Sequence, residues 1–461
     1  MGKAAIVLAA GFGTRMKSNR HKVLHEVCGK PMIQHIVDEL RTLPFQQILV
    51  VVGQQREAVE QALLGRAKTV FQDEQLGTGH AVRCAMGALD SGVEEVVVLY
   101  GDAPLIRAQT ISRLLEAREE SNSAVALLAA ELDNPFGLGR ILLSNDNHVL
   151  TIVEEKDATE AQKQIRLINA GTYAFRTSDL KDALAQLKAD NAQHEYYLTD
   201  TIAILRTMGK VCVPFVVEDP TEVLGVNDRA QLAEAQAVMG RRVATRWMKE
   251  GVTILDPATT YIGMDVQLSA DVTLLPGTVL EGATRIGQGS VVGPNARVSN
   301  CVIGEDVNVQ YAVIVDSVVD SNASVGPYAY IRPGSHIGAR VKVGDFVEIK
   351  NSNLGDDTKV SHLAYVGDAD IGQRVNVGCG AITVNYDGRL KQRTVVGDDS
   401  FVGSNVNLVA PLTVGKGAYL CAGSTISANV PDDGFAISRP QQVTKANYVS
   451  AWKQRRLAKR D

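Results

Sequence analysis

The segment Ala4–Met16 reads AAIVLAAGFGTRM and decides the fold of the first half of the chain. Residues 4–9 are small or apolar and predict a short buried strand, and the glycines after them predict a tight turn at its carboxyl end. Small residues at such a turn let backbone amides approach phosphate oxygens, and Arg15 with Lys22 adds positive charge. The loop lacks the closing Gly-Lys-Ser/Thr of a Walker A motif and the third glycine of dinucleotide-binding loops. Taken alone, the glycines are explained equally well by a tight turn without a ligand.

Further apolar runs alternate with helical patterns as far as residue 217. The apolar runs cover 48–52, 96–100, 125–129 and 211–217, and the helical stretches between them are 31–43, 56–64, 79–89 and 108–118. Alternating buried strands and helices predict an α/β domain with a largely parallel, Rossmann-like sheet that carries helices on both faces. Such sheets bind ligands beyond the carboxyl ends of their strands.

The composition is that of a soluble globular protein. The 461 residues include 47 Lys and Arg against 52 Asp and Glu, a net charge of −5, and 45% of them are hydrophobic. The length predicts two or three domains, and the mild acidity argues against a nucleic-acid partner. No apolar run approaches the ~18 residues of a membrane span, and the first residues suit a buried strand better than a signal peptide. Six cysteines without a CxxC pair predict reduced thiols and a cytoplasmic location.

From about residue 252 the sequence becomes repetitive. An aliphatic-Gly pair returns mostly at steps of 6 or 12 residues, as at 286 and 292, at 325, 337 and 343, and at 396, 402 and 414. A six-residue repeat predicts a parallel β-helix, with the aliphatic side chain inside and glycine at the corner. Three hexapeptides close one triangular coil, so residues 252–437 predict about ten coils. Period alone leaves open a purely structural rod or oligomerisation spacer.

A helical segment joins the two patterns. Residues 228–250 contain one glycine, Gly240, and too few clean heptads for an independent coiled coil. The predicted organisation is a first domain at 1–229, a linker helix at 230–250 and a second domain at 251–461.

The N-terminal motifs, taken together, resemble the sugar-nucleotidyltransferase family. They are LAAGFGTRM at 8–16, KVL at 22–24, GKP at 29–31, QDEQLGTGH at 72–80, LYGDAPL at 99–105, GLGR at 137–140, EEKD at 154–157, NAG at 169–171 and GVN at 225–227. Nucleotidyl transfer requires a neutralised triphosphate, an α-phosphorus open to attack and a stabilised pyrophosphate leaving group.

The resemblance implies a role for each motif. Arg15 and Lys22 would face the phosphates, and Asp102 would hold Mg²⁺ together with Asn227, because Mg²⁺ takes few protein oxygens besides phosphates and water. Without the resemblance, Asp102 would be interpreted as a turn residue. Gln72, Gly77 and Thr78 would read the uracil edge, while Gly137, Glu154 and Asn169 would hold the sugar; the last two could otherwise be ordinary surface residues. The implied contacts of UTP and UDP-N-acetylglucosamine are Leu8, Ala9, Ala10, Gly11, Arg15, Lys22, Gln72, Gly77, Thr78, Tyr100, Gly101, Asp102, Gly137, Glu154, Asn169 and Asn227.

Polar insertions in the repeat resemble a second family. They are Lys350, SHLAYVGD at 361–368, NVGCG at 376–380 and NYDG at 385–388. The family is that of the bifunctional N-acetylglucosamine-1-phosphate uridyltransferase/glucosamine-1-phosphate N-acetyltransferases of bacterial cell-wall synthesis. The resemblance covers essentially the whole chain in the same domain order. It implies a left-handed parallel β-helix, a homotrimer and acetyl-transfer sites between subunits.

Acetyl transfer to an amine needs a base, and His362 is the predicted one because imidazole titrates near neutrality. A lone histidine in a repeat would otherwise be a surface or core residue. The resemblance implies that Arg332 and Lys350 bind the sugar phosphate and that Tyr365 and Asn376 contact the sugar. It assigns acetyl-CoA to Cys379, Asn385, Tyr386, Ser404, Ala422 and Arg439. Cys379 departs from the family, where alanine is expected. The basic tail at 452–461 is interpreted either as a screen for the phosphates of CoA or as a solvated end.

The sequence therefore predicts a two-step enzyme. It would acetylate glucosamine 1-phosphate with acetyl-CoA, then join N-acetylglucosamine 1-phosphate to UTP and release pyrophosphate, with no nucleic-acid or membrane partner. One rival is a nucleotidyltransferase whose β-helix only oligomerises, and His362 with Asn385 and Tyr386 argues against it. The other is a non-enzymatic sugar-nucleotide sensor, which Lys22 and Asp102 disfavour.

Overall fold

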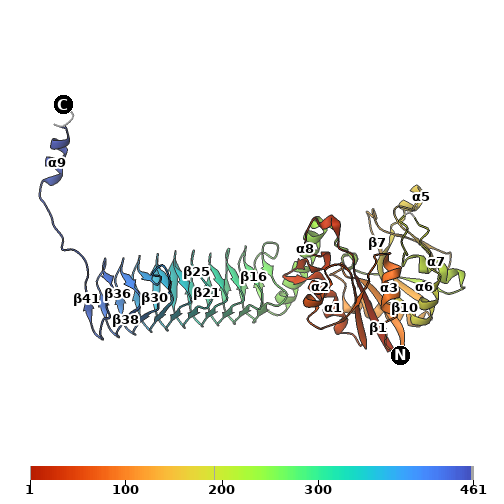
Figure 1. Ribbon diagram of the computed structural model, residues 1–461, viewed down its shortest axis with the longest axis horizontal. Coiled ribbons are helices and arrows are strands. Elements are labelled where there is room, and N and C mark those ends of the chain that lie inside the picture. The colour runs from red at the N-terminus through yellow and green to blue at the C-terminus, as the bar shows by residue number, and fades with distance from the viewer. Residues whose placement is uncertain (1, 192, 458–461) are drawn as a thin grey trace. The chain divides into compact units, whose positions relative to one another are not determined.

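The computed structural model describes residues 2–191 and 193–457. The chain divides into two compact units, Met1–Val243 and Ala244–Asp461 (Figure 1). The helix predicted between the two sequence patterns is confirmed as α8 (Arg229–Lys249), and the boundary between the units falls inside it. Across the described residues, no helix combines the length and the apolar character that a membrane crossing requires.

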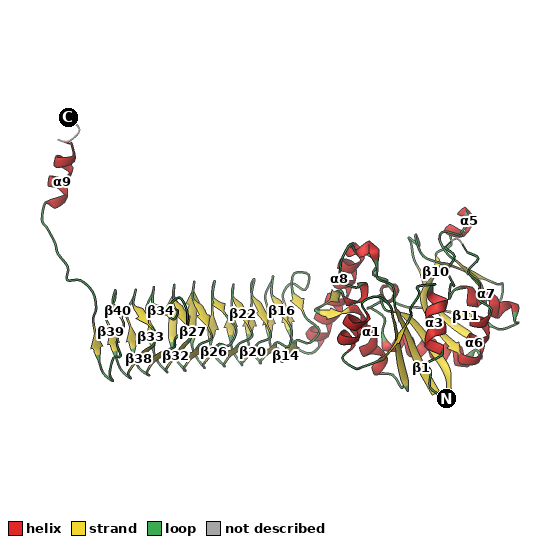
Figure 2. Ribbon diagram, in the orientation of Figure 1, coloured by secondary structure: helices red, strands yellow, loops and turns green. Residues whose placement is uncertain are grey.

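A nine-stranded sheet forms the centre of the first unit (Figure 2). Its strands are β1 (Gly2–Ala9), β4 (Gln47–Val52), β5 (Lys68–Phe71), β6 (Val93–Tyr100), β7 (Val125–Glu131), β8 (Arg140–Leu143), β9 (Val149–Val153), β10 (Leu167–Arg176) and β11 (Cys212–Val216). The main order is β11-β7-β10-β6-β1-β4-β5, with β8 beside β10 and β9 beside β8. Only β10 runs against the others along this path, since it pairs antiparallel with both β6 and β7. A separate small ribbon pairs β2 (Glu26–Val27) with β3 (Lys30–Pro31).

Helices cover both faces of this sheet. They are α1 (Met32–Arg41), α2 (Arg56–Leu63), α3 (Thr78–Met86), α4 (Ala108–Glu120), α6 (Thr177–Ala185) and α7 (Asp200–Thr207). The short helix α5 (Glu160–Lys163) has no buried residue, and 3-10 turns lie at η1 (Thr14–Met16), η2 (Lys22–Leu24) and η3 (Pro220–Val223). Successive residues of β1 point to opposite faces, as the pleat requires. Ala4, Ile6 and Leu8 pack in one core with α3, α6 and α7, whereas the intervening residues pack with α1, α2 and α4.

The sequence prediction of this unit is confirmed in part. All five predicted strands and four predicted helices end within three residues of their observed limits. The prediction lacked β5, β8, β9, β10 and the helices α5 to α7. The sheet is Rossmann-like as predicted, apart from the reversed β10.

The second unit is a left-handed parallel β-helix built of three sheets. The first sheet contains β12 (Thr253–Ile254), β15 (Thr273–Leu274), β18 (Val291–Val292), β21 (Asn308–Val309), β24 (Ser324–Val325), β27 (Lys342–Asp345), β30 (Lys359–His362), β33 (Asn376–Val377), β36 (Phe401–Val402), β39 (Tyr419–Leu420) and β41 (Phe435–Ala436). The second contains β13 (Tyr261–Ile262), β16 (Val279–Glu281), β19 (Arg297–Ser299), β22 (Val313–Val315), β25 (Tyr330–Ile331), β28 (Glu348–Lys350), β31 (Tyr365–Gly367), β34 (Ile382–Val384), β37 (Asn407–Val409) and β40 (Thr425–Ile426). The third contains β14 (Gln267–Leu268), β17 (Arg285–Ile286), β20 (Val302–Ile303), β23 (Val318–Val319), β26 (His336–Ile337), β29 (Asn353–Leu354), β32 (Ala369–Ile371), β35 (Thr394–Val396) and β38 (Leu412–Val414).

The three sheets contain 11, 10 and 9 strands, so the predicted count of about ten coils is confirmed. The inward aliphatic residues are buried, as Val292 and Val343 illustrate. Glycine follows them because neighbouring coils touch at the corner. A Cβ atom on Gly378 would lie 2.6 Å from the amide nitrogen of Ser404, and one on Gly403 would lie 2.5 Å from that of Ala422.

The coils are not all of one length. Paired residues of neighbouring coils usually lie 16 to 20 positions apart, as in Tyr365 with Ile382. The next step, from Ile382 to Asn407, is 25 residues, and the same step occurs in all three sheets. The extra residues form a loop after β34. Beyond the β-helix, α9 (Tyr448–Leu457) is exposed throughout; it holds the first part of the predicted basic tail, whereas 458–461 lie outside the described residues.

Candidate active sites

A cavity of about 390 Å³ opens at the carboxyl ends of β1 and β6. Ligand sites of α/β sheets are found in this position, as the sequence predicted. The lining residues are Leu8, Ala9, Ala10, Gly11, Lys22, Val23, Gln72, Gln75, Gly77, Thr78, Ala81, Tyr100, Asp102, Glu195 and Asn227. Most residues predicted to contact the nucleotide are therefore together in one cavity.

Positive charge and oxygen ligands meet at one end of this cavity. The ammonium group of Lys22 donates a hydrogen bond to Asp102 and contacts Oδ1 of Asn227 at 3.2 Å. Arg15 donates to the same Asn227 oxygen at 2.9 Å. Gly13 makes room for this arrangement, because it has φ +83° and a Cβ atom there would lie 2.6 Å from the Cβ of Lys22.

The pair Asp102 and Asn227 is suited to a small divalent cation. Both side-chain oxygens already contact one cation, the Lys22 ammonium. The amide of Val226 donates to the backbone oxygen of Asp102 at 2.8 Å, which fixes the two loops to each other. No group of three or more His, Cys, Asp or Glu side chains with metal-binding geometry occurs in the described ranges. A metal at this place would thus take most of its ligands from phosphates and water, as Mg²⁺ does.

The opposite side of the cavity is built from amides. Gln72 is buried, and its Nε2 donates to the Gly77 oxygen at 3.2 Å and lies 3.1 Å from Nδ1 of His80. Gln75 donates to the backbone oxygen of Ala10 at 2.7 Å. Thr78 accepts from the Leu198 amide at 3.0 Å. Sequence reasoning gave no role to Gln75 or His80, although both stand in the quoted motif.

The predicted sugar residues form a neighbouring group outside the cavity lining. Asn169 donates to the Tyr173 hydroxyl at 2.7 Å, and Glu154 accepts from Thr199 at 3.2 Å. Burial raises the pKa of Glu154, and the charges of Asp200 and Asp157 add to the effect.

The Tyr100 ring, packed on Gly171, links this group to the cavity lining, and two backbone amides make local hydrogen bonds. The amide of Gly137 donates to Glu155 at 3.1 Å. Gly101 donates from its amide to Leu8 at 2.8 Å. Tyr100 packs so closely on Gly171 that a Cβ atom there would overlap the ring. Burial raises the pKa of Tyr100, followed by the charge of Glu154, so the tyrosine remains a neutral hydrogen-bonding group.

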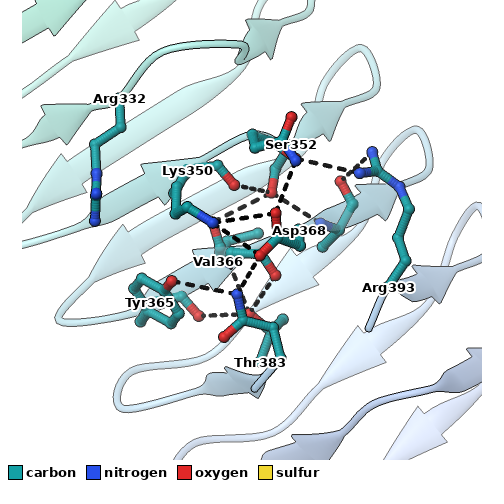
Figure 3. Close-up of polar contacts among 12 residues, drawn as sticks. Arg332, Lys350, Ser352, Tyr365, Val366, Asp368, Thr383 and Arg393 are labelled. Carbon is teal, nitrogen blue, oxygen red and sulfur yellow. Dashed lines mark hydrogen bonds and ion pairs between the residues drawn. The ribbon is translucent and has the colours of Figure 1, made fainter. Parts of the chain in front are cut away.

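On the β-helix, two of the four predicted sugar-binding residues, Lys350 and Tyr365, meet at the corner after β31. The Lys350 ammonium contacts Oδ2 of Asp368 at 2.9 Å, and Asn385 donates to the same oxygen at 2.5 Å (Figure 3). The Asn385 amide nitrogen also lies 3.4 Å from the Tyr365 hydroxyl. Asn385 begins the long loop after β34, so the loop brings its side chain onto this corner.

Two lysines lie at this corner, and an arginine lies on the same part of the β-helix. The hydrogen bond to Asp368 raises the pKa of Lys350, while the adjacent Lys350 lowers the pKa of Lys391. Arg332 pairs with Glu348 at 2.8 Å and stands apart from the Lys350 network in Figure 3. Such a group of cations is suited to a phosphate. Lys391 was missed by the sequence analysis because it has no motif of its own.

The remaining predicted residues lie along a different corner of the β-helix. His362 is exposed, and its Nδ1 lies 2.7 Å from Oδ1 of Asp345 in the preceding coil. The hydrogen bond from His362 lowers the pKa of Asp345. Asp345 was not predicted, although residues 17 positions apart stack in this part of the repeat.

The predicted acetyl-CoA residues follow this second corner into later coils. The oxygen of Cys379 accepts from the Asn405 amide at 2.7 Å, and that of Ser404 accepts from Gly423 at 2.8 Å. Arg439 donates to the oxygen of Ala422 at 3.0 Å. Cys379 is exposed, Asn376 lies on the adjacent sheet surface between Lys359 and Phe401, and Tyr386 is exposed in the loop. The contacts found among the described residues do not join His362 to the Lys350 network.

Comparisons with known proteins cover both units. A model of the MobA-like NTP transferase domain matches residues 5–249, and one of the GMPPB C-terminal domain matches 313–433. The bifunctional protein GlmU of Brevibacillus brevis is 52% identical over 446 residues, which is 97% of each chain. GlmU of Shouchella clausii is 46% identical over 448 residues, 97% of this chain and 99% of the relative. A solved structure of CMP:2-keto-3-deoxy-manno-octonic acid synthetase with CTP aligns with 52% of this chain and all of its own at 21% identity and a TM-score of 0.40.

Proposed function

The chain belongs to the GlmU family of bifunctional proteins, and we propose how its two units divide that family's activities. It is an acetyltransferase and uridyltransferase of UDP-N-acetylglucosamine synthesis. Residues 1–229 carry uridyl transfer from UTP to N-acetylglucosamine 1-phosphate. Residues 251–461 carry acetyl transfer from acetyl-CoA to glucosamine 1-phosphate. The observation that supports the first assignment most directly is the contact of Lys22 with both Asp102 and Asn227 in the cavity.

Uridyl transfer joins a sugar phosphate to the α-phosphorus of UTP. A phosphate oxygen of N-acetylglucosamine 1-phosphate forms the new P–O bond, and the bond to the β-phosphate breaks as pyrophosphate leaves with its electron pair. Arg15 and Lys22 stabilise the negative charge of the phosphates during this exchange. Asp102 and Asn227 hold Mg²⁺, which when bound neutralises phosphate oxygens. Gln72, Gly77 and Thr78 orient the uracil base, and Gly137, Glu154 and Asn169 hold the sugar.

Acetyl transfer replaces the C–S bond of acetyl-CoA by a C–N bond. The amino group of glucosamine 1-phosphate attacks the thioester carbonyl carbon, His362 takes the proton from nitrogen, and CoA leaves and is protonated to the thiol. Asp345 holds His362 through Nδ1, which leaves Nε2 as the proton acceptor. Lys350 and Arg332, with Lys391 beside them, bind the sugar phosphate, while Cys379, Ser404, Ala422 and Arg439 line the path of CoA.

A ladder of strained residues supports a homotrimer. The corners of the β-helix have positions with positive φ. At the corner before the second sheet, five of the nine positions are glycine or asparagine, as at Gly277, Asn295, Gly380 and Asn405. In four successive coils the position is instead occupied by Tyr311, Tyr328, Phe346 and Leu363, with φ from 36° to 58°. Bulky residues rarely adopt this conformation. All four are exposed, and the three aromatic rings stack at 5.4–5.5 Å. If a partner subunit covers this ladder, its contacts explain both why the strained backbone is kept and why the four large side chains are exposed in a single chain.

The same ladder explains how the two corners of the acetyl-transfer site could be joined. Leu363 follows His362 directly, and Phe346 follows Asp345. A subunit packed on the ladder therefore lies against the catalytic base. It can bring its own Lys350 corner to that base, which the contacts of one chain do not do. We place the enzyme in the cytoplasm, since all six cysteines are free thiols.

A lysine pair tests the uridyl-transfer assignment in the full chain. Lys22→Met should lower pyrophosphate release from UTP and N-acetylglucosamine 1-phosphate by at least about 10²-fold, because a charge on the reacting phosphates is lost. Release of CoA thiol with glucosamine 1-phosphate should be unchanged. Lys17→Met removes the same charge from the exposed end of the loop and should leave both rates unchanged. A Lys22→Met enzyme with a normal pyrophosphate rate would place the reaction elsewhere.

A further inference from the structure

Asp368 is unusual among the corner aspartates of the β-helix. Seven aspartates of the described residues have positive φ, and of these only Asp368, with φ 49°, is buried. The turn itself does not require a carboxylate. The same corner is occupied by Gly282, Asn300 and Gly334 in earlier coils, all with positive φ.

The buried carboxylate is surrounded by donors. Asn351 donates to Oδ1 at 2.7 Å, Lys350 contacts both oxygens, and Asn385 donates to Oδ2. Figure 3 shows the ammonium group of Lys350 directed at this carboxylate. Burial alone would raise the pKa of Asp368, but the hydrogen bonds from Asn351, Lys350 and Asn385 lower it below its usual range. Asp368 is therefore a fixed anion and an acceptor only.

This anion determines how the Asn385 amide is turned. A carboxylate cannot donate, so the Asn385 atom that faces it is the NH₂ group. The second contact of that nitrogen, 3.4 Å to the Tyr365 hydroxyl, occupies the same side of the amide. The carbonyl oxygen Oδ1 receives no hydrogen bond from the part of the chain that the structure describes, and it is not sealed from solvent. It is left as a free acceptor at the predicted acetyl-transfer site.

We propose that Asp368 is a positioning residue for acetyl transfer, which holds Asn385 with its carbonyl oxygen toward the attacking amine. The proposal rests on the acetyl-transfer site described above. An amine that attacks a thioester must present its lone pair to the carbonyl carbon while its N–H bonds find acceptors. In the site proposed between subunits, Oδ1 of Asn385 accepts one N–H bond and His362 of the partner subunit takes the proton of another, so the lone pair is directed at the thioester. Misorientation of a reacting group by about 1 Å costs about 10²-fold in rate.

Asp368→Asn is the direct test. The substitution keeps the size of the side chain but replaces one carboxylate oxygen by an NH₂ group. When this NH₂ group faces Asn385, it cannot accept the hydrogen bond from the Asn385 NH₂ group, so Asn385 is free to rotate. The expected result is a fall of about 10²-fold in kcat for CoA release, with the uridyl-transfer rate unchanged. Asp357→Asn is the matched control. Asp357 also has positive φ (62°) and an arginine partner, Arg340 at 2.8 Å, but it lies at another corner. It should leave acetyl transfer unchanged.

A double-mutant cycle separates positioning from general support of the fold. If Asp368 acts through Asn385, then Asp368→Asn should have little further effect in an Asn385→Ala enzyme. The proposal would be overturned if the two substitutions lowered kcat by independent factors that multiply in the double variant. It would also be overturned if kcat of the Asp368→Asn enzyme stayed within threefold of wild type. Should Asn385→Ala itself be fully active, the assignment of Asn385 to the site is what fails.

An exchanged pair covers the case in which Asp368→Asn does not fold. Asn385→Asp sets two carboxylates against each other and should lose the same factor in kcat. The double exchange, Asp368→Asn with Asn385→Asp, restores a donor opposite an acceptor and should recover at least tenfold. No recovery in a folded double variant would refute the orienting contact.

Discussion

The strained ladder gives the sharpest test of the proposed assembly, through Tyr328→Asn. Asparagine tolerates the left-handed backbone, so the substitution relieves about 1 kcal/mol of strain at φ 58°. It also removes two ring contacts, at 5.5 Å to Tyr311 and 5.4 Å to Phe346, each of about 0.5–1.5 kcal/mol. The free energy of unfolding of an isolated subunit should therefore fall by only about 1 kcal/mol.

The effect on assembly should be larger. Tyr328 is 57% exposed in the single chain, which corresponds to roughly 100 Å² of ring surface for a partner to cover. At about 25 cal/mol per Å², loss of that surface costs about 2–3 kcal/mol per subunit, or about 50-fold in affinity for each copy. Sedimentation equilibrium over a concentration series should show dissociation at concentrations where wild type is trimeric. Acetyl transfer should fall with the trimer, and uridyl transfer should not.

A matched control isolates the backbone effect. Asn405→Gly changes the same corner, with φ 56°, where no exposed ring is present, and should leave the assembly unchanged. If Tyr328→Asn sedimented like wild type at every concentration, the ladder would not be an interface. The exposed aromatic residues would then need another partner.

Four further measurements address the separate sites. Asp102→Asn should abolish Mg²⁺-dependent pyrophosphate release and spare CoA release, because it removes the one carboxylate among the proposed metal ligands; unchanged rates at limiting Mg²⁺ would refute that role. His362→Ala should lower CoA release by about 10²–10⁴-fold with uridyl transfer intact, and a variant within threefold of wild type would move the base elsewhere. Burial of His21 lowers its pKa from 6.5 to about 4. Between these two pH values the unfolded state binds a proton that the folded state does not bind. The free energy of unfolding therefore falls as the pH drops from 6.5 toward 4. Urea unfolding of the first unit should be easier at pH 5 than at pH 7, with about 2 kcal/mol of the difference from His21. His21→Asn should reduce that slope, and His25 and His35, whose pKa values burial also lowers, should account for the remainder. A bulky thiol reagent should block acetyl transfer with protection by acetyl-CoA, and Cys379→Ala should be active and resistant; an active but sensitive variant would point to Cys421.

The fold could be predicted where the sequence repeats a short-range pattern. The six-residue repeat predicts the β-helix because every coil repeats the same requirements, an inward aliphatic side chain and a glycine where the next coil comes close. β10 could not be predicted in the same way. Its segment, LINAGTYAFR, is interrupted by Gly171, and its reversed direction depends on β6 and β7, which are far away in the chain. The sequence motif NAG at 169–171 lies within β10, but the motif alone did not predict a strand there.

The limits of the site prediction have a related cause. Motifs identified Lys22, Asp102 and Asn227, which the structure brings into contact. They did not identify Asp345, because its contact with His362 depends on how coils stack. That stacking joins residues 16 to 18 positions apart in most coils, and no local pattern records whether a given step is 16, 17 or 18. Lys391 was not predicted because it lies in the loop that interrupts the repeat, where no repeat position applies.

In a repetitive fold, residues that the repeat does not require carry the most information about function. A corner with positive φ is satisfied by glycine or asparagine, as at Gly282, Asn295, Asn300 and Gly380. Tyr328 and Asp368 occupy such corners with a large ring and with a buried charge, and both choices are costly for the isolated chain. The two residues lie at different corners but within three coils of each other, on either side of the sheet that carries Tyr365. The strain at Tyr328 and the buried charge of Asp368 have a common explanation if Tyr328 contacts a neighbouring subunit and Asp368 orients Asn385. A site between subunits needs both an interface and a correctly oriented Asn385 amide. The Tyr328 and Asp368 variants should therefore fail differently: the first should lose acetyl transfer in a concentration-dependent way, and the second should lose it equally at every concentration.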